Sequence, residues 1–297
     1  MATDPLDQLS ETLADRVAAA GDFVVTVSTG HRHRSGILWR PDIVVTSEQV
    51  LPDQPQFTVT RAGAEVTATV AGRDRGTNVA ALRLAPPLQG ASLPAAEANA
   101  RVGSLTLVLG ADASGRTTAR LGMLHAAGPE WHSMTGGRID ALLRLDVRLG
   151  ADEGGPVLAT SGGLLGMSTS GPRRRSLVIP AATIGRVLDP LLAEGRIARG
   201  WLGVGLQPVA VPDSLRQTAG QEAGMMVVSL ASGGPAEQAG ILPGDILLDV
   251  DGTPARRPRG LAAVLGPDRI GKSVALRLLR AGALQTLSLT ITARPPA

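Results

Sequence analysis

The first twenty residues carry apolar side chains at helical spacing. Leucine or valine recurs every three or four positions from 6 to 17, after Asp4 and Pro5 and before Gly21. Aspartate is a favoured residue just before a helix, and proline is favoured at its first position. The pattern therefore predicts an amphipathic helix within residues 1–21, ended by Gly21.

Between residues 22 and 180 the pattern changes to short apolar or alternating segments separated by Gly, Pro and Asp. The segment EVTATVA, at 65–71, alternates apolar and polar side chains. Many short strands without intervening helices are typical of β-barrels or sandwiches and not of βαβ units. The expected strands cover residues 23–28, 36–39, 42–46, 65–71, 79–84, 104–109, 117–127, 141–147, 163–169 and 176–180.

The pattern of apolar and polar residues changes again at Pro180. Residues 181–198 are apolar on one side at helical spacing, with Pro190 as an expected kink, and predict a linker helix. A β-rich unit is expected over residues 199–294, with short helices at 234–240 and 259–266 and several strands. The chain is thus divided into a helix, a β domain at 22–180, a linker helix and a second, smaller domain.

Composition narrows the functional classes. The 297 residues suit two domains, and the cores must be aliphatic because the chain has two Phe, three Trp and no Tyr. Without cysteine there is no disulfide or thiol chemistry. A net charge of +3 with few aromatic residues does not indicate nucleic-acid binding. No apolar run is long enough to span a membrane, and the acidic N-terminus lacks signal-peptide features, so a cytoplasmic location is expected.

The most specific stretch is SGGPAEQAGILPGDILLDVDG, residues 232–252. It resembles a PDZ domain of the type attached to bacterial HtrA/Deg proteases. In that family a loop of backbone amides captures a peptide C-terminus, and the peptide adds a strand to the sheet edge. The alternative is that Trp201 and Leu202 seal the domain junction and no ligand binds. The resemblance implies these peptide-binding residues: Trp201, Leu202, Gly203, Val204, Leu261 and Leu265.

The resemblance extends through the first β domain. The stretches DIVVTSEQVL, GTNVAALRL and GADEGGPVL are similar, in order, to the family's segments around its histidine, aspartate and serine. The chain is thus identified as an HtrA/Deg-type, trypsin-like protein with one C-terminal PDZ domain. This implies a mainly β fold, a chymotrypsin/trypsin-like double β-barrel followed by a PDZ domain.

The carried-over triad positions hold the wrong chemical groups. The general base falls on Gln49, its orienting carboxylate on Asn78 and the nucleophile on Glu153, while the outer oxyanion-hole glycine falls on Ala151. A glutamine amide cannot take a proton near neutral pH, and a carboxylate is a poor nucleophile without a base. The resemblance therefore implies a degenerate pseudoprotease, not an enzyme, that acts as a scaffold, adaptor or assembly factor for partner proteins or their C-terminal peptides.

Several alternatives stay open. Glu153 with Asp152 and Asp146 could serve a different hydrolysis as acid and base. The basic loop GPRRRS, at 171–176, either pairs with Glu153 or is solvated. His31 and His33 share a face of an extended segment, but without nearby ligands we expect no metal and no cofactor. The resemblance also implies a homotrimer.

Overall fold

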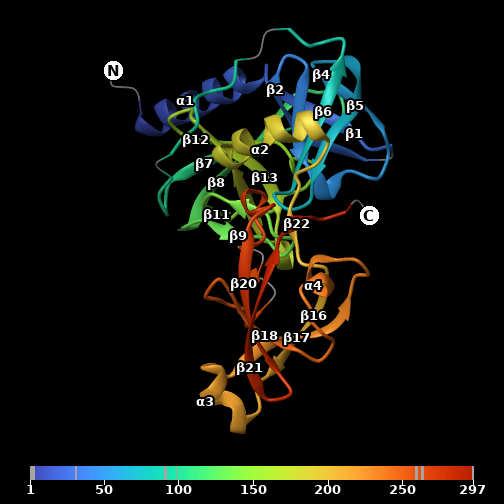
Figure 1. The fold of residues 1–297 in the computed structure, drawn as a ribbon. Helices are drawn as coiled ribbons and strands as arrows, with labels where there is room; N and C mark the ends of the chain where they lie inside the picture. The colour runs from blue at the N-terminus through green and yellow to red at the C-terminus, as the bar shows by residue number, and fades with distance from the viewer. Residues whose placement is uncertain are drawn as a thin grey trace. The chain divides into compact units, whose positions relative to one another are not determined.

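The computed structural model describes residues 4–30, 32–89, 92–98, 100–257, 260–261 and 264–295. The chain forms two compact units (Figure 1), one of residues 1–131 and 139–197, the other of residues 132–138 and 198–297. Within the described chain, no helix has both the length and the apolar character needed to cross a membrane.

The N-terminal helix α1 spans Pro5–Ala20, as its spacing predicts. The side chain of Asp4 accepts a 2.9 Å hydrogen bond from the backbone N–H of Leu6, which satisfies one of the unpaired amides at the start of the helix. Leu13 and Val17 pack against the core of the first unit, whereas Leu6 is 72% exposed. The C-terminal half of α1 thus provides its packing face.

Six strands of the first unit close into a barrel in the order β1-β2-β3-β6-β5-β4. Its interior is lined by aliphatic side chains such as Val27, Ile37 and Leu82, which are fully buried. Closure pairs β1 with β4, so no strand edge is left for water or another chain. The strands are β1 (Val24–Ser28), β2 (His33–Arg40), β3 (Ile43–Ser47), β4 (Gln56–Arg61), β5 (Ala64–Asp74) and β6 (Val79–Ala85).

A second closed barrel follows in the order β11-β14-β13-β12-β7-β8. Val108, Leu124 and Val157 form part of its buried core. A short pair, β9 (Trp131–His132) and β10 (Arg138–Ile139), lies outside the barrel ladder. The barrel strands are β7 (Leu105–Ala111), β8 (Thr117–Gly128), β11 (Leu142–Leu145), β12 (Pro156–Ala159), β13 (Leu164–Ser170) and β14 (Ser176–Pro180).

Helix α2 spans Ala181–Glu194 and includes Pro190. Ile184, Val187 and Leu191 are buried against the barrels. Gly195 ends the helix in the left-handed conformation, with φ 71°, which a residue without a Cβ adopts at little cost. The apolar stripe in the sequence is therefore the face that covers the first unit.

The second unit is built on the sheet β16-β17-β18-β20-β21, with β19 (Thr253–Pro254) beside β18. Short strands β15 (Gly200–Trp201) and β22 (Thr292–Ala293) pair separately. The unit also has two short helices, α3 (Arg216–Ala219) and α4 (Pro235–Gln238), and short 3₁₀ turns. The sheet strands are β16 (Val204–Ala210), β17 (Ala223–Leu230), β18 (Ile246–Val250), β20 (Ser273–Arg280) and β21 (Ala283–Thr290).

The prediction of a mainly β chain with a double barrel followed by a smaller β module is confirmed. Of the strands in the two barrels, β4 and β12 are absent from the expectation. In β4, Phe57 and Val59 are buried and alternate with exposed Gln56 and Thr58, so its signal was present in the sequence. The expected helix at 259–266 falls partly outside the described residues.

Candidate functional site

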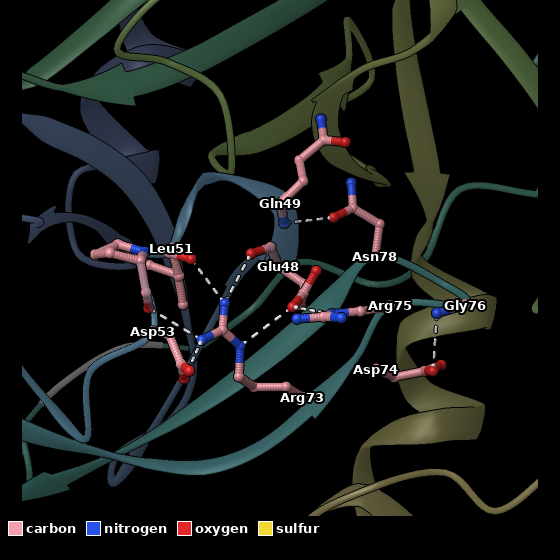
Figure 2. A network of polar contacts seen from close by, with 10 residues as sticks. Glu48, Gln49, Leu51, Asp53, Arg73, Asp74, Arg75, Gly76 and Asn78 are labelled. Carbon is pink, nitrogen blue, oxygen red and sulfur yellow. Dashed lines mark hydrogen bonds and ion pairs between the residues drawn. The ribbon is translucent and has the colours of Figure 1, made fainter. Parts of the chain in front are cut away.

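Gln49 and Asn78 come from neighbouring loops of the first barrel. A 3₁₀ turn, Glu48–Val50, follows β3 and carries Gln49, while Asn78 directly precedes β6. Asn78 has φ 59°, a left-handed conformation that asparagine tolerates better than most residues. Its Oδ1 accepts a 2.8 Å hydrogen bond from the backbone N–H of Gln49 (Figure 2), so the two loops are fixed to each other.

Glu153 comes from the second barrel, on the turn between β11 and β12. The next residue, Gly154, has φ 94°, and a Cβ there would lie 2.3 Å from both Ser35 O and Thr46 Oγ1. The Gly154 N–H donates to Ser168 O at 2.9 Å, which ties the turn to β13. Close packing at a glycine thus lets this turn approach the first barrel and leaves Glu153 only 8% exposed.

The carboxylate of Glu153 receives four hydrogen bonds from neutral donors. Gln49 Nε2 lies 2.6 Å from Oε1, and the backbone N–H of Ser170 donates to the same oxygen at 2.9 Å. The Ser170 hydroxyl donates to Oε2 at 2.8 Å, and the Thr169 hydroxyl lies 3.3 Å from Oε1. The charge of Glu153 is therefore stabilised by oriented dipoles.

The hydroxyl of Thr169 joins all three predicted triad positions. It lies 2.6 Å from Asn78 Nδ2 and 3.0 Å from Gln49 Nε2, in addition to its contact with Glu153. The Ser47 hydroxyl is a further neighbour, at 3.2 Å. The structure thus brings Gln49, Asn78 and Glu153 into one polar cluster. Sequence reasoning missed Thr169 and Ser170, for which the sequence carries no evident signal.

The backbone around Ala151 does not present two free amides. The N–H of Glu153 donates to Gly150 O at 3.3 Å, and the carbonyl of Ala151 accepts a 2.8 Å bond from Ser35 Oγ. An oxyanion hole requires amides aimed at the reacting oxygen. The backbone N–H of Glu153 is therefore already bonded within the protein, and the side chain of the same residue is an acid.

An ion-pair cluster around the buried carboxylate of Glu48 supports the turn that carries Gln49. Figure 2 shows the guanidinium of Arg73 among Glu48, Leu51 and Asp53. Arg73 donates to Leu51 O at 2.7 Å and lies 3.2 Å from the carboxylate of Glu48, whose side chain is 9% exposed. Arg75 contacts the same carboxylate at 3.5 Å. This cluster was not anticipated, although the spacing of two arginines in GRDR was visible.

The nearby carboxylates are held by separate partners. Asp152 Oδ1 accepts a 3.0 Å bond from Gly150 N and lies 3.3 Å from Arg120 Nε, while Asp146 Oδ1 accepts from Met123 N at 2.7 Å. Asp152 and Asp146 are thus held by different hydrogen-bond partners. These contacts give no support to a convergent acid and base pair with Glu153.

The alternative that the basic loop 171–176 pairs with Glu153 stays a prediction, because the side chain of Arg174 lies outside the described residues. Among the residues with described side chains, no arginine lies within ion-pair distance of its carboxylate, and Arg173 is exposed. Of the histidines, His31 lies outside the described residues, and His33 begins β2. Within the described chain, no cluster of three or more metal-ligating side chains occurs.

A second candidate site lies in the second unit. A cavity of about 220 Å³ is bounded only by residues of that unit. Leu202 and Leu261 are nearly buried, at 3% and 5% exposure, and form part of its apolar wall. All the residues that the resemblance implied for peptide binding line it: Trp201, Leu202, Gly203, Val204, Leu261 and Leu265.

The loop before β16 is held by two backbone hydrogen bonds. Gly203 has φ 79°, and its carbonyl accepts from Ala231 N at 2.8 Å, while the carbonyl of Leu202 accepts from Ala236 N at 2.9 Å. Both carbonyls therefore point into the protein. Among the described residues, no backbone acceptor is found for the amides of Leu202 and Gly203, so they can donate to an anion in the cavity.

Each of the two units contains a region that matches a known protein family. The family model described as trypsin-like peptidase domain matches residues 34–167, and the PDZ domain model matches residues 200–291. Two proteins named "Probable periplasmic serine endoprotease DegP-like" are similar to the chain. The one from Rhizobium meliloti (strain 1021) is 30% identical over 261 residues, which is 85% of this chain and 51% of the relative. The one from Brucella suis biovar 1 (strain 1330) is 30% identical over 262 residues, 85% of this chain and 50% of the relative. The chain thus spans about half the length of the curated relatives it matches.

Solved structures give the same architecture. "HtrA-type protease AlgW with decapeptide" superposes with a TM-score of 0.74 at 22% identity, covering 96% of this chain and 99% of the other. The "serine endoprotease from Yersinia pestis" has a TM-score of 0.72 at 25% identity, covering 95% and 98%.

Two expectations are wrong in the light of these comparisons. The prediction that the chain is not an enzyme is contradicted because its relatives are named serine endoproteases, which points to a protease. The prediction of a cytoplasmic location is contradicted because the curated relatives are named periplasmic, and the charge pattern of the first residues was a poor guide. The chain consists of an HtrA/DegP-type trypsin-like peptidase domain followed by a C-terminal PDZ domain.

Proposed function

We propose that this chain binds the C-termini or extended peptides of partner proteins through the cavity of residues 199–294. The observation that supports this proposal most directly is that all six residues expected to contact a peptide line one cavity. Apolar walls beside backbone amides suit a terminal apolar side chain and its carboxylate. The barrels at 22–180 then act as the scaffold that presents this binding module, and the chain is an adaptor or assembly factor.

The proposal includes a degenerate triad. Gln49 offers an amide in place of a base, Asn78 an amide in place of a carboxylate, and Glu153 a hydrogen-bonded acid in place of a nucleophile. The contacts of Glu153 support a structural role for these three residues, because they join the loops of two barrels.

A matched glycine pair tests peptide binding. The positions of Gly203 and Gly220 both have left-handed φ, 79° and 69°, so alanine strains both backbones. Only Gly203 lines the cavity. Binding of a C-terminal peptide library to the full chain is measured by fluorescence anisotropy. We expect Gly203→Ala to abolish binding and Gly220→Ala to preserve it. Equal binding by the two variants would refute the assignment of the cavity.

The oligomeric state is a separate part of the proposal. The family resemblance implies a homotrimer, and exposed Leu6 and Leu9 on α1 offer apolar surface at the N-terminal end of the described chain. Light scattering at micromolar concentration is expected to give three times the mass of the 30.4 kDa chain. The mass of a single chain would refute the homotrimer and leave the proposal of peptide binding unaffected.

A further inference from the structure

The cavity of the second unit carries positive charge. Arg199 and Arg294 are among the residues that line it, and none of the lining residues is acidic. Arg199 directly precedes β15 and Arg294 directly follows β22, and the backbone N–H of Arg294 donates to Arg199 O at 2.9 Å.

Arg294 has no counter-charge of its own. Its side chain is exposed, and among the described residues no carboxylate lies within ion-pair distance of it. Other arginines of this unit are paired, for example Arg277 with Asp249 and Arg280 with Asp245. An unpaired guanidinium at the edge of an otherwise apolar cavity is therefore available to a ligand.

We infer that Arg294, with Arg199 beside it, makes the cavity select peptides that end in an apolar residue and carry an acidic side chain among their last few residues. This inference rests on the proposed peptide binding. Leu202, Leu206 and Leu265 provide the apolar wall for the terminal side chain. The planar guanidinium of Arg294 matches a carboxylate with two parallel hydrogen bonds, in addition to the amides that receive the terminal carboxylate.

The test uses the full chain and N-terminally labelled ten-residue peptides that end in leucine. In one set, glutamate stands at each of the last few positions before the leucine in turn; in the matched set, glutamine replaces it. Anisotropy at low and moderate salt gives the dissociation constants. We expect the best glutamate peptide to bind about fivefold more tightly than its glutamine partner, with the difference decreasing as salt rises.

Charge reversal assigns the effect to the arginine. Arg294→Glu should remove or invert the glutamate preference, measured as the ratio of the dissociation constants of the glutamine and glutamate peptides. Lys272→Glu changes the net charge equally at an exposed residue that does not line the cavity, and should preserve the preference. Equal affinities for both peptide sets would overturn the charge selection while peptide binding stands. Absence of binding by every peptide would overturn both the selection and the proposed function.

Discussion

The side-chain amide of Gln49 lies 2.6 Å from the carboxylate of Glu153 and links a turn of the first barrel to a turn of the second. Gln49 itself is exposed, whereas Glu153 is buried. A hydrogen bond to a charged acceptor contributes more to stability than one between neutral groups. The contact places Gln49 and Glu153 in a mutually stabilising arrangement.

Glu153→Ala should destabilise the first unit by about 2 kcal/mol. The change leaves the backbone N–H of Ser170 without its acceptor and opens space where the carboxylate stood. Chemical denaturation of the full chain, followed by a probe of the first unit, measures the loss. Glu153→Gln is the matched control, since it preserves shape and one acceptor oxygen, and it should cost less than half as much. A neutral effect of Glu153→Ala would contradict the structural role.

Arg73→Ala should cost about 3 kcal/mol of stability. The variant leaves the nearly buried carboxylate of Glu48 with only the more exposed Arg75 and removes the donor to Leu51 O. Arg83→Ala removes an exposed pair with Asp42 and should change stability by about 0.5 kcal/mol or less. Thermal melts of both variants are compared. Similar losses of stability in the two variants would show that burial of the Glu48 carboxylate does not strengthen its ion pairs.

Much of the fold could be predicted from periodicity and turns. The helix at Pro5–Ala20 follows from Asp4, Pro5 and the spacing of leucines, because local capping and one apolar face specify it. β12, Pro156–Ala159, was missed because its four residues directly follow two glycines and are too short to alternate. Closure of each barrel depends on pairing between distant strands, which local pattern does not specify.

Asp112 should give the first unit a pH-dependent contribution in acid. Its pKa is lowered from 3.8 to about 2, first by the hydrogen bond from the Ser114 hydroxyl and then by the backbone N–H of Arg116. Because the folded-state pKa is lower, the stabilisation is fully present above about pH 4 and is lost as pH falls through about 2. Melting temperatures of the wild type and Asp112→Asn should therefore converge between pH 4 and pH 2. A constant difference across that range would contradict the assignment.

Restoring the triad should increase proteolysis. The triple variant Gln49→His, Asn78→Asp, Glu153→Ser supplies a base, its orienting carboxylate and a hydroxyl at positions that already lie together. A positioned general base contributes about a hundredfold or more to such a reaction. Casein hydrolysis by the variant should exceed that of the wild type by at least this factor. Equal rates for both proteins would show that these three residues do not define the chemistry of the chain.

The site was only partly visible in the sequence. The order and spacing of the motifs predicted that Gln49, Asn78 and Glu153 lie close together. In the structure, the hydroxyl of Thr169 contacts all three side chains. The partners of Glu153 could not be foreseen, because Ser170 reaches it only when β13 pairs beside the turn. Whether the basic loop 171–176 pairs with Glu153 or is solvated stays a prediction, because the side chain of Arg174 lies outside the described residues.

The most direct test of peptide binding is to locate the bound peptide. A labelled peptide with a photoreactive group on its terminal side chain is cross-linked to the full chain, and the attachment sites are read by mass spectrometry. The account predicts cross-links to Trp201, Leu206 or Leu265, which line the cavity, and their loss in Gly203→Ala. Cross-links confined to residues 22–180, or unchanged in Gly203→Ala, would contradict it.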